Sequence, residues 1–371
     1  MTTVGVPTEI KVDEHRVGLT PAGVRELTQR GHTVLVQEGA GKGSAIPDAD
    51  FVAQGATIVA DADAVFAQAD LVVKVKEPQP VEVARLRPDQ TLFTYLHLAP
   101  DAQLTQGLID SGATTIAYET VTDARGRLPL LAPMSEVAGK LATQAGAYAL
   151  HKYSGGRGIL LGGVAGVAAA KVVVIGGGVV GTNAARVAVG MGADVAIYDR
   201  NIDRLRELEQ TLAGVDTCFA STLDVEQAIG DADLIIGAVL VHGAKAPYVI
   251  RRDQLAQLKP GAVLVDVSID QGGCFETSRP TTHSEPTYEV DGIVHYCVAN
   301  MPGAVPITST LALTNATLPY VLQLADLGVR DALRADQGFL DGLATVGGRL
   351  TSEPVALDQG LEFTPPAEAL A

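Results

Sequence analysis

The sequence predicts an α/β fold with two doubly wound domains, and three observations lead to this prediction. The chain has 371 residues, which is long for one domain and suits two. Short apolar runs alternate with helical patterns in the first third of the chain and again from Lys171. A glycine-rich turn directly after an apolar run opens the second series. This alternation is typical of parallel sheets covered by helices on both faces.

The first series begins with an extended segment at Val4–Pro7. Further strands are expected at Thr33–Gln37, Thr57–Val59, Leu71–Val75, Thr91–Tyr95 and Thr114–Tyr118. Helical patterns lie between them at Pro21–Gln29 and Asp61–Gln68. A helix rich in Ala, Leu, Lys and Gln then runs to about Tyr153, with Ser135 as its expected N-cap.

The second series follows Lys171 and predicts a second sheet. Its strands are expected at Val172–Ile175, Asp194–Tyr198, Leu234–Val239, Val263–Val267 and His295–Val298. Pro302 breaks the pattern. The region Ile307–Asp326 looks helical, and we expect an interruption at Pro319. The tail after Thr351 shows no regular pattern.

Composition excludes several classes of protein. A formal charge of −16 disfavours a nucleic-acid partner, which requires a dense basic surface. No apolar run approaches the ~18 residues that span a bilayer, and no signal peptide is visible, so we expect a soluble cytoplasmic protein. Cys218, Cys274 and Cys297 are widely spaced, which predicts small buried side chains and no metal site.

The strongest local motif is Gly176-x-Gly178-x-x-Gly181, which follows an apolar strand and opens a helix. In the dinucleotide-binding fingerprint the first glycine permits a tight turn, and the second admits a pyrophosphate close to the backbone. The third allows the helix to pack against the strand, and the helix N-terminus supplies N–H groups to the anion. The alternative is a strand–helix turn without a ligand.

Asp199 ends the next strand, 23 residues beyond Gly176, near the ~20-residue offset of a ribose-binding acid. A carboxylate there accepts hydrogen bonds from ribose hydroxyls and repels a 2′-phosphate. The motif therefore favours NAD over NADP as the cofactor. Arg200 is a neighbouring cation that would tolerate a phosphate, and it weakens this preference.

Four ionisable residues follow predicted strands, at the sheet edge where doubly wound folds bind ligands. They are Arg16, Lys76, His97 and Asp270. Arginine grips carboxylates bidentately, lysine polarises a carbonyl, and histidine exchanges protons near neutral pH. Each has a plain alternative: a solvated surface charge for the two cations, a buried hydrogen-bonded ring for the histidine, and a turn-forming acid before two glycines for the aspartate.

Longer motifs add a family resemblance. They are Val4–Val17, Lys74–Pro78, Leu96–Leu98, Ala117–Thr120, Leu131–Gly139, Gly237–Val241, Asp266–Gly273 and Cys297–Pro302. In this order and over essentially the whole chain, they resemble alanine dehydrogenases of the mycobacterial type. The resemblance implies a Rossmann NAD-binding domain, 135–304, inserted into a Rossmann-like substrate domain made of 1–134 and 305–371.

The resemblance also implies roles for individual residues. Arg16 and Lys76 would hold pyruvate, His97 would be the acid/base, and Asp270 would be the second catalytic residue. The residues expected to bind NAD are Ser135, Gly176, Gly178, Val179, Val180, Gly181, Asp199, Arg204, Val239, Leu240, Val267, Ser268, Ile269, Asp270, Arg279, Val298, Ala299, Asn300 and Met301. A serine that binds NAD in relatives aligns at Ala220, beside Ser221, so this one contact stays open.

The implied reaction is the reversible oxidative deamination of L-alanine to pyruvate and ammonia, and glyoxylate is an alternative substrate. Family members usually form hexamers. Two alternatives share the layout. The alpha subunit of proton-translocating transhydrogenase binds NAD without an amino-acid pocket, and saccharopine dehydrogenase takes a bulkier substrate. The joint presence of Arg16, Lys76, His97 and Asp270 favours alanine dehydrogenase.

Overall fold

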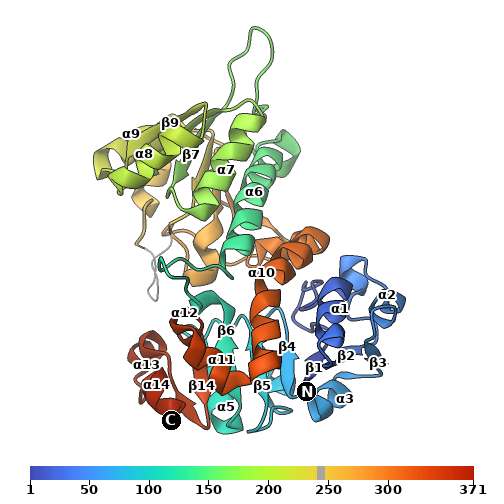
Figure 1. Cartoon of the computed structure of the whole chain (residues 1–371). Coiled ribbons are helices and arrows are strands. Elements are labelled where there is room, and N and C mark those ends of the chain that lie inside the picture. Colours follow the sequence, from blue (N-terminus) through green and yellow to red (C-terminus); the bar gives the residue numbers. More distant parts are fainter. Residues whose placement is uncertain (240–246) are drawn as a thin grey trace. The chain divides into compact units, whose positions relative to one another are not determined.

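The computed structural model describes residues 1–239 and 247–371, and the chain divides into two compact units (Figure 1). Met1–Met134 and Val305–Ala371 form the first unit, and Ser135–Ala304 form the second. The second unit is therefore inserted in the chain between two parts of the first. Within the described residues, no helix combines the length and the apolar character needed to cross a membrane.

The first unit contains an eight-stranded sheet in the described part of the chain, in the order β15-β14-β6-β5-β4-β1-β2-β3. Its strands are β1 Thr3–Val6, β2 Thr33–Gln37, β3 Thr57–Val59, β4 Leu71–Val73, β5 Thr91–Thr94, β6 Thr114–Ala117, β14 Leu343–Val346 and β15 Arg349–Leu350. The strands from β3 to β6 pair in parallel, whereas β14 is antiparallel to both β6 and β15. The C-terminal segment thus completes the sheet that the N-terminal segment begins.

Helices of both chain segments cover this sheet. They are α1 Pro21–Gln29, α2 Asp48–Val52, α3 Ala62–Gln68, α4 Pro80–Val83, α5 Ala102–Ser111, α10 Pro306–Leu327, α11 Val329–Ala335, α12 Gln337–Leu340, α13 Glu353–Gln359 and α14 Pro366–Ala369. Helix α10 lies beside α1 (Figure 1). The chain winds from β1 to β3 on one side and then returns to place β4 on the other side of β1. This reversal at β1 and β4 is the point where doubly wound sheets bind ligands.

The second unit has a seven-stranded sheet among its described residues, in the order β12-β13-β11-β10-β7-β8-β9. Its strands are β7 Lys171–Ile175, β8 Asp194–Asp199, β9 Val215–Phe219, β10 Leu234–Gly237, β11 Val263–Asp266, β12 Thr287–Val290 and β13 Ile293–Tyr296. Its helices are α6 Ala132–Ala149, α7 Val179–Gly190, α8 Ile202–Thr211 and α9 Thr222–Gly230. All strand pairs are parallel except β12–β13, and the winding reverses between β7 and β10.

Successive side chains of β7 point to opposite faces of the sheet, and apolar residues on both faces bury the strand on both sides. Val172 and Val174 belong to the apolar cluster shared with α6 and α7, whereas Val173 and Ile175 belong to the cluster shared with α9. Helices α6 and α7 lie side by side (Figure 1). They approach closely at Gly139, where an added Cβ would lie 2.2 Å from the Val180 carbonyl oxygen.

The structure confirms the α/β class with two parallel-dominated sheets and corrects three local predictions. Helix α6 begins at Ala132, so Ser135 lies within its first turns and is not the N-cap. Pro319 lies inside an unbroken α10, because buried residues such as Thr317 and Val321 continue one face across it. The tail after Thr351 is not irregular throughout, since it forms α13 and α14.

Candidate active site

Arg16 follows β1 and Lys76 follows β4, so both belong to the loops at the point where the first sheet reverses its winding. Both side chains are buried, with exposed fractions of 2% for Arg16 and 6% for Lys76. Their plain alternative, a solvated surface charge, is therefore excluded. A buried cation requires an anionic partner or ligand, because removing the charge from water is costly.

The Arg16 guanidinium is oriented by a neighbour in its own loop. Its Nε and Nη2 donate to the two carboxylate oxygens of Glu14, at 2.6 and 2.5 Å. Its Nη1 lies 3.0 Å from Met134 Sδ. Burial opposes the charged form of Arg16, but the Glu14 contacts outweigh it and raise the guanidinium pKa. Arg16 is thus a permanently charged group with a fixed plane.

A second buried ion cluster lies under the β4 loop. Lys74 is fully buried, and its Nζ donates to Glu9 at 3.0 Å and to Glu82 at 2.7 Å. The other oxygen of Glu9 accepts from the Val75 backbone N–H at 2.6 Å. This cluster fixes the main chain between β4 and Lys76.

His97 follows β5 and has a backbone φ of +50°, which is rare for a residue with a side chain. Its N–H donates to Glu119 Oε1 at 2.6 Å. Its ring Nδ1 lies 3.5 Å from Glu77 Oε2, and the other Glu77 oxygen pairs with Lys11. The side chain is 28% exposed, so it is neither a fully buried ring nor a freely solvated one.

In the second unit the glycine motif has the geometry that the fingerprint predicts. Gly176 has φ +105°, and an added Cβ would lie 2.4 Å from the Ala238 carbonyl oxygen. An added Cβ at Gly181 would lie only 1.8 Å from the Gly176 carbonyl oxygen, whereas at Gly178 it would meet nothing within 4 Å. Gly178 is the N-cap of α7 and provides no side-chain cap, so the loop fits a pyrophosphate against the helix N-terminus.

Asp199 ends β8 beside this loop. Its Oδ2 accepts from the Gly177 N–H at 2.6 Å and its Oδ1 from the Asn201 N–H at 2.8 Å. Arg204 also contacts the loop, donating from Nε to the Gly177 carbonyl and from Nη2 to Thr182 Oγ1, each at 2.6 Å. The structure therefore brings together the glycines, Asp199 and Arg204 at the carboxyl ends of β7 and β8.

The turn that contains Asp270 is built around a buried acid that the sequence argument did not single out. Asp266, at the end of β11, is fully buried and accepts from Ser268 N–H at 3.0 Å and from Ser278 Oγ at 2.5 Å. Burial raises the pKa of its carboxyl, although hydrogen bonds from Ser278, Cys274 and Phe275 oppose the rise. The turn Val267–Gln271 carries Asp270 into solvent, and Ser268 Oγ ties it to the Val239 carbonyl at 2.7 Å.

The other predicted cofactor residues lie in the same unit. Val298, Ala299, Asn300 and Met301 follow β13, and Asn300 has φ +65°. The Arg279 guanidinium lies 4.1 Å above the ring of Tyr288. Ser221, the alternative to Ala220, caps α9 and accepts from the Asp224 N–H at 3.1 Å. Leu240 lies outside the described residues.

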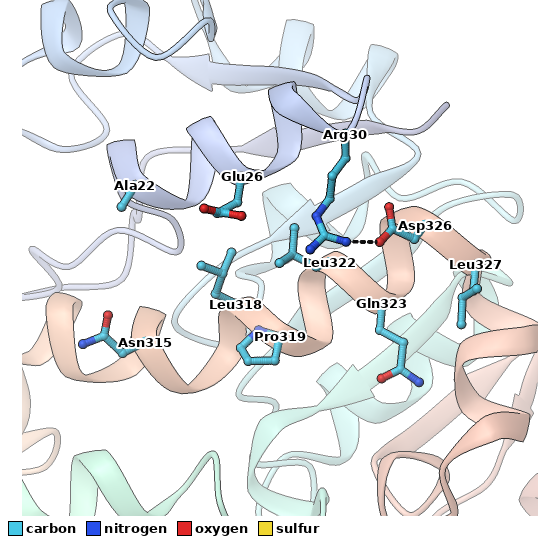
Figure 2. Close-up of a pocket in the computed structure, with 10 residues that line it drawn as sticks. All are labelled: Ala22, Glu26, Arg30, Asn315, Leu318, Pro319, Leu322, Gln323, Asp326 and Leu327. Carbon is cyan, nitrogen blue, oxygen red and sulfur yellow. Dashed lines mark hydrogen bonds and ion pairs between the residues drawn. The ribbon is translucent and has the colours of Figure 1, made fainter.

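A surface groove between α1 and α10 lies apart from these residues (Figure 2). Its lining is mainly apolar and includes Leu318, Pro319 and Leu322, with an ion pair of 2.6 Å between Arg30 and Asp326. None of its ten lining residues is a predicted site residue.

Sequence reasoning assigned no role to several acids that hold the site residues. They are Glu14, Glu77, Glu119 and Asp266. Three of them stand within four residues of a predicted site residue, and this proximity was the available signal. Glu119 carried no such signal, because it is brought to His97 by the pairing of β5 with β6.

The chain matches two family models, described as the N-terminal and C-terminal domains of alanine dehydrogenase/PNT, over residues 5–138 and 142–353. A relative named alanine dehydrogenase from Mycolicibacterium smegmatis is 59% identical over 369 residues, which cover 99% of this chain and 100% of the relative.

Two solved structures share the architecture. A structure titled L-alanine dehydrogenase matches with a TM-score of 0.92 and 50% identity, covering 96% of this chain and 99% of that one. A transhydrogenase from Sinorhizobium meliloti is more distant, with a TM-score of 0.79 and 25% identity over 95% of this chain and 99% of that one. The chain therefore belongs to the alanine dehydrogenase/PNT family, as its motifs predicted.

Proposed function

We propose that the protein is an NAD-dependent L-alanine dehydrogenase that interconverts L-alanine with pyruvate and ammonia. The observation that carries this proposal is the buried, oriented Arg16, the buried Lys76 and the partly exposed His97, which lie in the loops that follow β1, β4 and β5 of one sheet. A small 2-oxo acid needs a cation for its carboxylate, a second cation for its carbonyl oxygen and a proton donor. The high identity to named alanine dehydrogenases supports the same reaction.

The proposed cofactor is NAD. The open space at Gly178, the uncapped start of α7 and the carboxylate of Asp199 fit a dinucleotide whose ribose carries no 2′-phosphate. The chemistry that NAD supplies when bound is acceptance of a hydride from the alanine Cα. Asp199 would accept hydrogen bonds from the ribose, and the N–H groups at the start of α7 would bind the pyrophosphate.

Arg16 and Lys76 are proposed to bind the substrate. Arg16 would hold the substrate carboxylate in a plane that Glu14 fixes in advance, which reduces the entropy lost on binding. Lys76 would stabilise negative charge on the oxygen of the carbonyl or of the water adduct. His97 would take and return the proton as water adds and ammonia leaves, and Asp270 would stabilise the positive charge that develops on nitrogen.

One assay panel tests the proposal. The purified chain is mixed with NADH, ammonia and pyruvate, glyoxylate or 2-oxobutyrate, and oxidation of NADH is followed. We expect activity with pyruvate and alanine-dependent formation of NADH in the reverse direction. NADH binding without either activity would point to a transhydrogenase-type subunit, and activity only with lysine plus 2-oxoglutarate would point to saccharopine dehydrogenase.

The proposed assembly is a cytoplasmic homohexamer, which follows the family resemblance. Multi-angle light scattering of the purified protein measures the mass directly. A particle of about six times the 38.4 kDa chain mass supports the hexamer, and a monomer contradicts it.

A further inference from the structure

His97 has a strained backbone that a carboxylate stabilises. The Glu119 side chain accepts from two successive backbone N–H groups, those of Leu96 at 3.1 Å and of His97 at 2.6 Å. A positive φ at a residue with a side chain persists only where its surroundings enforce it. Glu119 therefore fixes the direction in which the His97 side chain leaves the main chain.

The ring itself faces a second carboxylate. Glu77 Oε2 lies 3.5 Å from His97 Nδ1, and the Glu77 side chain is only 14% exposed. Among hydrogen bonds within the described chain, neither Nδ1 nor Oε2 has another partner. The 3.5 Å separation exceeds the usual N–H···O distance of about 2.7–3.2 Å by a few tenths of an ångström.

Glu77 is ionised in this setting. Burial raises the pKa of its carboxyl, but His97, Lys76 and Lys11 together outweigh burial and hold that pKa well below its usual value. An ionised carboxylate only accepts hydrogen bonds, so its partner nitrogen has to carry the hydrogen.

We propose that Glu77 is the positioning residue of His97. It accepts a hydrogen bond from Nδ1–H and so keeps the neutral ring in the tautomer whose Nε2 carries the lone pair. That lone pair would then face the substrate, and this step rests on the proposed function. Lys11 holds Glu77 from its other oxygen, and Glu119 holds the backbone of His97.

Because the proposal specifies the tautomer of the His97 ring, it can be tested without substrate. The chain has seven histidines, and ¹⁵N spectra of histidine-labelled protein compared with His97→Gln identify the His97 signals. We expect the Nδ1–H tautomer in the wild type and a mixture of tautomers in Glu77→Leu. Glu77→Gln retains an acceptor oxygen and should preserve the tautomer in part. A wild-type ring in the Nε2–H form would overturn the proposal.

Lys11→Leu is the matched control. It removes the Lys11–Glu77 ion pair, which Glu77→Leu also removes, but it leaves the Glu77 carboxylate opposite His97 Nδ1. We expect Lys11→Leu to keep the wild-type tautomer and activity within a few-fold. If Lys11→Leu loses as much activity as Glu77→Leu while the ring keeps the Nδ1–H tautomer, the loss in both variants comes from the ion pair with Lys11, and Glu77 does not act through the ring. Circular dichroism of each variant checks folding, and Glu77→Gln carries the test if Glu77→Leu does not fold.

Kinetics provide the second readout. Glu77→Leu should lower kcat by about 10-fold or more, the lower end of the loss seen when a metal-bound histidine loses its outer hydrogen-bond partner, with the pyruvate KM within a few-fold. The acidic limb of the kcat/KM profile should move to lower pH in Glu77→Leu and Glu77→Gln. Other groups also surround the Glu77–His97 pair, namely Lys11, Lys76, Glu119 and Tyr95. The shift of the acidic limb is therefore compared with the shift that Lys11→Leu produces.

The two readouts separate two kinds of failure. If the wild type turns over no alanine but shows the Nδ1–H tautomer, the proposed function fails and the positioning of His97 stands. If the wild type is active and Glu77→Leu retains both turnover and tautomer, the positioning role fails and the proposed function stands.

Discussion

In the first unit the loops of the candidate site hold charged side chains in buried ion pairs, whereas the glycine loop of the second unit offers mainly backbone groups. Arg16 and Lys74 are each at most 2% exposed and are matched by buried acids. The dinucleotide loop depends instead on Gly176, Gly178 and Gly181 and on the start of α7. The buried ion pairs should therefore be sensitive to loss of charge. The dinucleotide loop should be sensitive to added side-chain volume or to a misplaced carboxylate.

The largest effect is expected at Lys74. Lys74→Met leaves Glu9 and Glu82 buried without a cation, and removing one partner of a buried ion pair costs about 3–5 kcal/mol. We expect this loss in urea unfolding followed by circular dichroism at one protein concentration. Adding Glu9→Gln and Glu82→Gln should recover much of the lost stability, because the two acids then no longer carry buried charges without a cation. A single variant as stable as the wild type would contradict the account.

The same variant has a predictable pH dependence. Burial already raises the pKa of Glu9 in the folded protein, with Lys74 opposing the rise, so Lys74→Met should raise it further. An acid whose pKa is higher in the folded state binds more protons when folded, and stability then falls as pH rises between the unfolded and folded pKa values. The variant should therefore lose more stability at pH 8 than at pH 5.5. Equal losses at both values would show that removing Lys74 does not change proton binding by the folded protein between pH 5.5 and pH 8.

The next effect concerns turnover and tests whether the two units contribute to one reaction. His97→Ala and Asp270→Asn should each lower kcat by about 10²-fold or more, with NADH binding retained. If both groups act as a unit, the double variant should be little worse than either single one. Fully additive losses, or a single variant within a few-fold of the wild type, would remove the pair from the mechanism.

The sequence did not indicate β9, β12, β14 or β15, but it predicted β1 to β6 with ends within two residues, and hence the loops that hold Arg16, Lys76 and His97. It could do so because each strand is a short apolar run that stops at a polar residue. The ion pairs were not predictable in the same way. Glu9 and Lys74 are 65 residues apart and meet because β4 returns beside β1, which is a property of strand order.

The strands at the edges of the first sheet could not be predicted from the apolar pattern either. Strand β14 pairs with β6 across more than two hundred residues, as in the hydrogen bond of 2.8 Å between Thr115 and Thr345. Pro319 argued for a break in α10, but packing of the helix outweighs the one lost backbone hydrogen bond.

A smaller effect is expected from Arg16→Lys. The charge remains, but the planar fork that grips Glu14 and would grip a carboxylate is lost. The pyruvate KM should rise about 10-fold or more, the scale of one lost charge-assisted hydrogen bond. Glu14→Gln is the control, since it keeps the guanidinium but replaces its buried carboxylate partner by a neutral amide, so a smaller rise in the pyruvate KM is expected. A large loss of NADH affinity in Arg16→Lys would instead assign the residue to the nucleotide or the scaffold.

The smallest effect, a change of cofactor preference, concerns the carboxylate of Asp199 at the glycine loop. Asp199 accepts from the Gly177 N–H at 2.6 Å, so Asp199→Ala removes both a negative charge and a loop contact. Asp199→Asn removes the charge and keeps an acceptor oxygen. If repulsion of a 2′-phosphate sets the preference for NAD, both variants should lower the ratio of kcat/KM with NAD to kcat/KM with NADP. Arg200 and Arg204 would then remain to attract the phosphate.

If only Asp199→Ala changes this ratio, the loop contact and not the charge is responsible. Equal use of both cofactors by the wild type would show that Asp199 does not select the ribose at all.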